Sequence, residues 1–85
     1  MSITTNSAAK PPTAETVIAS ISNVYGEVQA EKIWAELCDE LHYPKRNLSI
    51  DQLHDVIKHM SEQKGALGVV GKSMSVRIMV AKTLS

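Results

Sequence analysis

The sequence predicts an all-α fold, a small four-helix bundle that follows a disordered N-terminal tail. Apolar residues recur at helical spacing in three successive segments, and capping residues and glycines mark where these segments begin and end. The 85 residues include no Phe, two Tyr and one Trp, so the core must be mainly aliphatic, which suits helix packing. A chain of this length is expected to form one domain with one modest core.

The N-terminal region divides into a tail and a first helix. Residues 1–12 are small and polar and end in two prolines, so we expect a disordered tail before a single helical domain over 13–85. Thr13 is a suitable N-cap for a helix over about 14–25, and Gly26 is a natural stop. The apolar residues of this helix are Val17, Ile18, Ile21, Val24 and Tyr25.

A second helix is expected over about 27–42, with charged residues on its remaining surface. Its apolar stripe consists of Ile33, Trp34, Leu37, Cys38 and Leu41. A loop should follow, because Pro44 disfavours helix at Tyr43 and cannot donate a backbone hydrogen bond.

The third helix should begin with a capping box, in which Ser49 and Gln52 each bond the other's backbone N–H. Gly65 is the expected residue after its C-terminal end. Its apolar stripe consists of Ile50, Leu53, Val56, Ile57 and Met60.

The last segment, 66–85, fits two structures. As a helix it has one apolar face of Leu67, Val70, Met74, Ile78 and Ala81, and an adjoining face of Ala66, Val69, Val76 and Val80. A helix that is apolar on most of its circumference is either central or shared with a partner. As strands, alternating residues would form a hairpin, which gives three helices plus a C-terminal β-hairpin in a winged-helix-like fold. We favour the helix because the segment has no turn pair such as Asn-Gly.

These helices predict a core of ten residues from the last three segments. They are Ile33, Trp34, Leu37, Leu41, Leu53, Ile57, Met60, Val70, Met74 and Ile78.

Charge and cysteine content suggest the cellular setting. Net charge is zero, but residues 1–41 carry net −4 and residues 42–85 carry net +4. We favour an intramolecular or head-to-tail match between the two halves over an anionic partner. The single Cys38 excludes an intramolecular disulfide, and the sequence lacks a signal-peptide pattern and a membrane-length apolar run. These features predict a soluble, cytoplasmic protein that does not bind membranes.

Residues 66–73, "ALGVVGKS", nearly match the phosphate-binding pattern G-x-x-x-x-G-K-[ST]. That motif must follow a buried strand, whereas here a helix precedes it and only 12 residues follow Ser73. We therefore predict no nucleotide site. The small residues Gly65, Ala66, Gly68 and Gly71 instead suggest that another helix approaches closely.

Other candidate sites lack essential parts. Cys38 and His42 are spaced to share a metal ion, but a structural zinc needs two more ligands. His59 and Lys64 are the candidates for a phosphotransfer site, in which the histidine carries a phosphoryl group and the lysine neutralises it. Lys64 follows His59 by five residues, which places the two side chains about 140° apart on a helix, so Lys64 cannot neutralise a phosphoryl group on His59. No pattern of nucleophile and base is present. We expect no catalytic, cofactor or metal site.

The sequence therefore favours a non-catalytic protein–protein interaction or regulatory module that self-associates, as a homodimer, through 66–85. A nucleic-acid-binding regulator that uses the basic C-terminal end is the alternative, and a phosphotransfer-type signalling bundle is a minor one. The predicted partner-binding residues are Lys72, Val76, Arg77, Met79 and Lys82.

Overall fold

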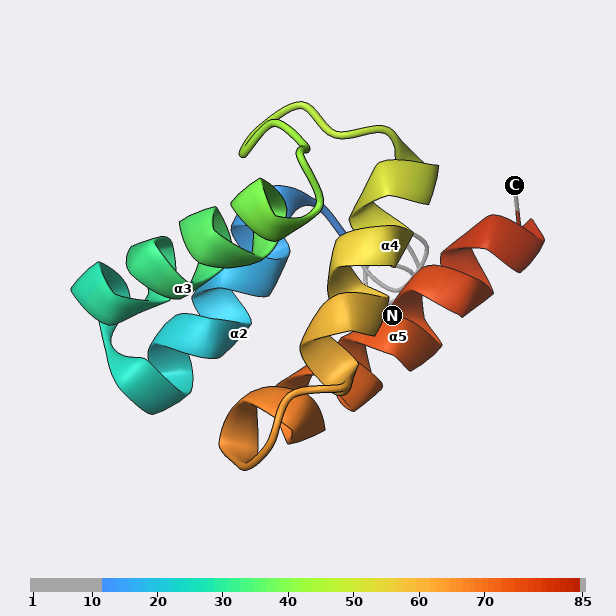
Figure 1. The fold of residues 1–85 in the computed structure, drawn as a ribbon. Helices are drawn as coiled ribbons and strands as arrows, with labels where there is room; N and C mark the ends of the chain where they lie inside the picture. The colour runs from blue at the N-terminus through green and yellow to red at the C-terminus, as the bar shows by residue number, and fades with distance from the viewer. Residues whose placement is uncertain (1–11, 85) are drawn as a thin grey trace, which may run out of the picture.

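The computed structural model describes residues 12–84, and the predicted disorder of residues 1–11 lies outside this range. The described chain forms four helices in the order α2 (Ala14–Tyr25), α3 (Glu27–Glu40), α4 (Ile50–Ser61) and α5 (Ala66–Leu84). Two pairs are evident: α2 lies beside α3, and α4 packs along α5 (Figure 1). This arrangement confirms the all-α, four-helix prediction.

The alternative with a C-terminal β-hairpin is wrong. Residues 66–84 form one continuous helix, and residues 12–84 contain no strand. The physical reason is that the helical conformation puts Met74 and Ile78 on one side, where both are buried against the other helices. In a strand both would still share a face, but Leu67 would fall on the opposite one.

A single glycine connects α2 to α3. Thr13 caps the start of α2, where its Oγ1 accepts a hydrogen bond from the Thr16 N–H, as predicted. Gly26 then adopts φ 86° and ψ 161°, a conformation that is essentially restricted to glycine. Its N–H donates to the Ser22 carbonyl at 2.8 Å and its carbonyl accepts from the Ala30 N–H at 2.9 Å. The chain therefore reverses direction within one residue.

Helix α3 ends at Glu40, two residues before the predicted end. His42 has φ 61°, and its N–H donates to the Asp39 carbonyl while the Tyr43 N–H donates to the Cys38 carbonyl. These two bonds form a Schellman closure, with a histidine in the left-handed position that glycine usually occupies. The closure ends the helix before Pro44 is reached.

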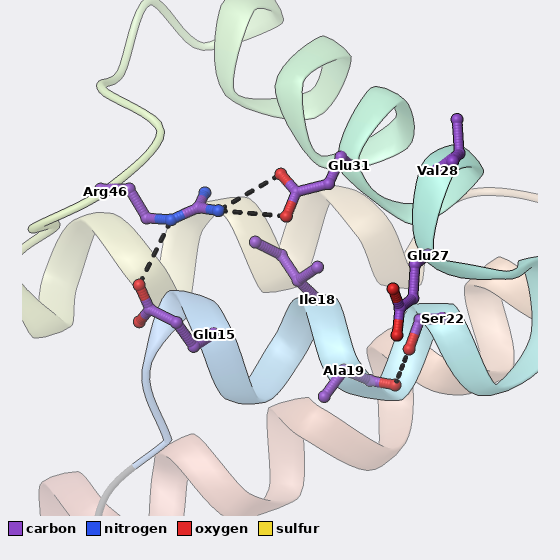
Figure 2. A pocket seen from close by; sticks show the side chains of 8 residues that line it. All are labelled: Glu15, Ile18, Ala19, Ser22, Glu27, Val28, Glu31 and Arg46. Carbon is purple, nitrogen blue, oxygen red and sulfur yellow. Dashed lines mark hydrogen bonds and ion pairs between the residues drawn. The ribbon is translucent and has the colours of Figure 1, made fainter.

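The loop between α3 and α4 is bonded to three helices. Trp34 Nε1 on α3 donates to the Lys45 carbonyl at 2.8 Å. The Arg46 guanidinium lies 3.2 Å from a carboxylate oxygen of Glu15 on α2 and 3.2 Å from one of Glu31 on α3 (Figure 2). The Tyr43 hydroxyl donates to Asp55 on α4 at 2.6 Å. The loop thereby joins the α2–α3 pair to α4.

The start of α4 matches the prediction and its end does not. Ser49 and Gln52 form the predicted capping box. Gly65, however, does not follow the end of α4; it immediately precedes α5, with φ 75°. The reason is that the chain leaves α4 at Ser61, where the N–H groups of Glu62 and Gln63 bond carbonyls three residues earlier.

Two glycines allow α5 to pack closely against the end of α4. A Cβ atom on Gly71 would lie 2.6 Å from Ser61 Cα and 2.8 Å from the Met60 carbonyl carbon. A Cβ atom on Gly68 would likewise collide with the Gln63 carbonyl group. Both glycines are buried. The prediction that small residues at the start of 66–85 let another helix approach closely is confirmed for Gly71, whereas the close neighbour of Gly68 is the turn before α5.

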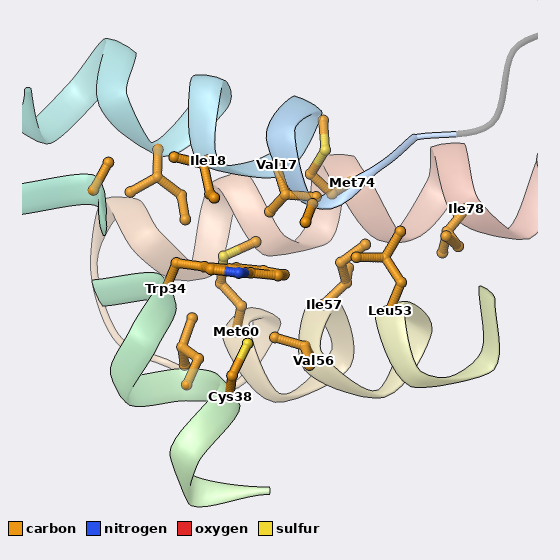
Figure 3. Close-up of a cluster of buried hydrophobic side chains, with 14 residues drawn as sticks. Val17, Ile18, Trp34, Cys38, Leu53, Val56, Ile57, Met60, Met74 and Ile78 are labelled. Carbon is orange, nitrogen blue, oxygen red and sulfur yellow. The ribbon is translucent and has the colours of Figure 1, made fainter. Parts of the chain in front are cut away.

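The core fills the space between the two helix pairs. Trp34 projects from α3 between α2 and α4 and has no exposed surface (Figure 3). Of the ten predicted core residues, seven are buried, and Ile33, Leu41 and Val70 are partly buried. The buried set is Ala14, Val17, Ile18, Ile21, Ala30, Trp34, Leu37, Cys38, Leu53, Val56, Ile57, Met60, Met74 and Ile78.

Candidate interaction surface

The outward side of α5 exposes a row of apolar side chains. Val69, Val76, Met79 and Val80 are 68%, 64%, 57% and 50% exposed. Their spacing places them on one side of the helix, opposite the buried Met74 and Ile78. We refer to these four residues together with Lys72 as the α5 outer face.

The C-terminal half of this face is slightly hollowed. Val76, Met79, Val80 and Thr83 line a shallow depression of about 320 Å³. The structure thus brings together Val76 and Met79, two of the predicted partner-binding residues. Val69 and Val80 were not predicted as site residues. Their spacing of seven and four residues from Val76 is typical of one side of a helix and could have identified them.

The predicted cations have different surroundings. Lys72 lies one turn before Val76, and both Lys72 and Arg77 are exposed and have no ion pair within residues 12–84. Lys82 instead turns toward α4, where its Nζ lies 3.3 Å from Asp51 Oδ1 and 3.0 Å from His54 Nδ1. The structure therefore does not place Lys82 with the other predicted contacts.

A second surface feature lies between α2 and α3, and we call it the α2–α3 groove. It has a volume of about 490 Å³ and an apolar part formed by Ile18, Ala19 and Val28 (Figure 2). Its polar lining is Glu15, Ser22, Glu27, Glu31 and Arg46. The sequence did not predict this groove. Arg46 lines it only because the loop between α3 and α4 folds back toward α2, and no local pattern indicates that fold.

The groove carries net negative charge. Arg46 spans one end and pairs with both Glu15 and Glu31. Glu27 takes part in no ion pair within the described part of the chain. The lining therefore holds three carboxylates and one guanidinium. Glu27 and Val28, which is 74% exposed, lie at the end opposite to Arg46 (Figure 2).

The residues considered for metal binding or phosphotransfer are not assembled into such sites. Cys38 is buried in the core, and His42 is exposed beyond the end of α3. Among residues 12–84, no three His, Cys, Asp or Glu side chains are grouped to hold a metal ion. His59 Nε2 lies 2.5 Å from Glu40 Oε1, while Lys64 lies in the turn after α4.

The near match to a phosphate-binding loop, residues 66–73, forms the first two turns of α5. Its backbone N–H groups are therefore arranged as in a helix and do not curl around a phosphate. Lys72 points outward with the α5 outer face.

None of the helices within residues 12–84 combines the length and apolarity needed to cross a membrane. Comparison of the chain with protein-family models, with curated proteins and with solved structures found no match.

Proposed function

We propose that this chain is a non-catalytic protein–protein interaction module that self-associates through the α5 outer face, with a homodimer as the smallest assembly. One observation carries the proposal: four large apolar side chains on one side of α5 are at least half exposed. Full burial of one such side chain stabilises by about 1.5–3 kcal/mol, so covering all four favours association. Exposed apolar side chains gathered on one side of a helix are typical of an interaction site.

The nucleic-acid alternative has less support. Its winged-helix form required a hairpin in 66–82, which is helical, and Lys82 is engaged with Asp51 and His54 on α4. The phosphotransfer alternative was considered for His59, whose ring contacts Glu40. Neither alternative explains the exposed valines of α5.

Sedimentation over a series of concentrations tests the proposal. The wild-type chain should self-associate, and Val76→Glu/Met79→Glu should be monomeric because association would bury two carboxylates. Val24→Glu is the matched control, since Val24 is 51% exposed and lies outside both surfaces. Far-UV circular dichroism verifies that each variant is folded.

A wild-type chain that remains monomeric at the highest concentration would contradict the proposal. Salt-dependent binding to DNA by such a monomer, lost in Lys72→Glu or Arg77→Glu, would favour the nucleic-acid alternative instead.

A further inference from the structure

We infer that the α2–α3 groove is the docking site for the α5 outer face of a second copy of this chain. The inference deepens the proposed function and rests on it: self-association then joins two different surfaces instead of two α5 helices. Two observations carry it: both surfaces expose apolar side chains, and their charges are opposite.

The two surfaces are independent of each other within one chain. The α5 outer face belongs to one helix, whereas the groove is lined by α2, α3 and Arg46 from the loop, and no residue is shared. The outer face of α5 cannot turn into its own groove, because Met74 and Ile78 hold the opposite side of the helix in the core. Each copy therefore presents both surfaces at once.

The two surfaces match in apolarity. Valines and a methionine project from the α5 outer face, three of them around its shallow depression, and the groove has Ile18, Ala19 and Val28 in its lining. The groove is open, and its volume of about 490 Å³ can accept side chains of a partner. Insertion of Val76 and Met79 would cover Val28, whose 74% exposure is the highest among the large apolar residues that are exposed.

Charge decides between this contact and a symmetric α5–α5 contact. The sequence from 64 to 85 contains no acidic residue, and the cation of the α5 outer face is Lys72, so a symmetric contact between two such faces would bring like charges together. The groove offers three glutamates against Arg46. Glu27 on one copy and Lys72 or Arg77 on the other are without ion pairs within residues 12–84. Charges at an interface rim select partner and orientation more than they add affinity, which is the role needed here.

A complementation experiment tests the inference. The α5 variant, Val76→Glu/Met79→Glu, keeps an intact groove, and the groove variant, Glu27→Lys/Val28→Lys, keeps an intact α5 outer face. We expect each variant alone to be monomeric and a one-to-one mixture to form a heterodimer that does not grow further, because only one intact surface of each kind is present. Association of the wild type should weaken by about tenfold or more between low and high salt.

The other outcomes separate the inference from the proposed function. If the groove variant alone still self-associates like the wild type while the α5 variant is monomeric, α5 packs against itself; the inference is then overturned and the proposed function stands. A mixture that stays monomeric also overturns the inference. If the wild type itself is monomeric, both fail. Circular dichroism and thermal unfolding of each variant ensure that a monomer is a folded one.

Discussion

Cys38 lies in the last turns of α3 with no exposed surface, and its environment determines its chemistry. Burial raises the pKa of the thiol from 9.0 to about 11; Asp39 adds to the effect, while Lys45 and Arg46 oppose it. The group therefore remains a protonated, apolar side chain at neutral pH and contributes to packing. The pKa of Tyr43 is also raised, chiefly because its hydroxyl donates a hydrogen bond to Asp55, which favours the neutral phenol.

These two groups predict that stability falls at alkaline pH. A pKa that is raised on folding contributes stability that is fully present below the unfolded pKa and is lost as pH rises through the folded pKa. For Cys38 the loss should begin near pH 9 and continue to about 11. Cys38 contributes at most about 1.4 kcal/mol per pH unit in this range.

Urea unfolding measured from pH 7 to pH 11 provides the check. Cys38→Ala lowers stability at every pH because it leaves a cavity, but it should flatten the decline above pH 9. Parallel curves for the variant and the wild type would show that the thiol does not titrate as expected.

At the scale of the element, most helix boundaries follow from residues within one turn of them. Thr13, Gly26 and the Ser49–Gln52 capping box act where the sequence predicted, because caps bond to backbone groups three or four residues away. The end of α4 differs from the prediction. Helix α4 ends at Ser61, and Gly65 immediately precedes α5. The presence of a glycine therefore did not indicate whether it follows one helix or precedes the next.

Gly71→Ala tests the close contact of α5 with α4. Helix propensity alone favours alanine by about 1 kcal/mol. The added Cβ would nevertheless lie 2.6 Å from Ser61 Cα, a backbone atom that cannot move independently. We expect a net loss of about 1–3 kcal/mol, because a strained backbone contact outweighs the gain in propensity.

Ser73→Ala is the matched control, since Ser73 is exposed on the same helix. It should be neutral or slightly stabilising in chemical denaturation. A Gly71→Ala variant as stable as this control would mean that α4 and α5 separate without cost.

At the scale of the whole molecule, two helix pairs share one core. Trp34 from α3 reaches between α2 and α4 (Figure 3). In the loop that follows α3, Arg46 pairs with Glu15 on α2 and Glu31 on α3, and Tyr43 bonds to Asp55 on α4. The pairs should therefore unfold together as one cooperative unit.

Leu37→Ala on α3 and Ile57→Ala on α4 test whether the two helix pairs unfold cooperatively. Both side chains are buried, so each variant should lose about 2–4 kcal/mol of the free energy of unfolding. Val24→Ala, at an exposed position, should change it by less than about 0.5 kcal/mol. Trp34 fluorescence reports on the core and far-UV circular dichroism on all helices, and their transitions should coincide in each variant. Separate transitions would mean that the pairs unfold independently.

The sequence alone determined the fold class, three of the four helix starts through their caps or glycines, and seven fully buried residues among ten predicted. These features depend on local periodicity and on bonds within one turn, which the order of residues encodes directly. For α5 the same signal identified the buried residues Met74 and Ile78, but a helix that is apolar on most of its circumference does not show how much of the adjoining apolar face stays exposed.

The sequence placed Met74 and Ile78 in the core, and both are buried. Only the tertiary structure showed that Val69 and Val80 are exposed on the same side of α5 as Val76 and Met79. Burial of the opposite side depends on Gly68 and Gly71, whose missing side chains let that side of α5 meet the end of α4 and the turn after it. The tertiary structure also placed Lys82 beside Asp51 and brought Arg46 into ion pairs with Glu15 on α2 and Glu31 on α3. Such contacts join residues 15 to 31 positions apart in the sequence, and no local pattern records them.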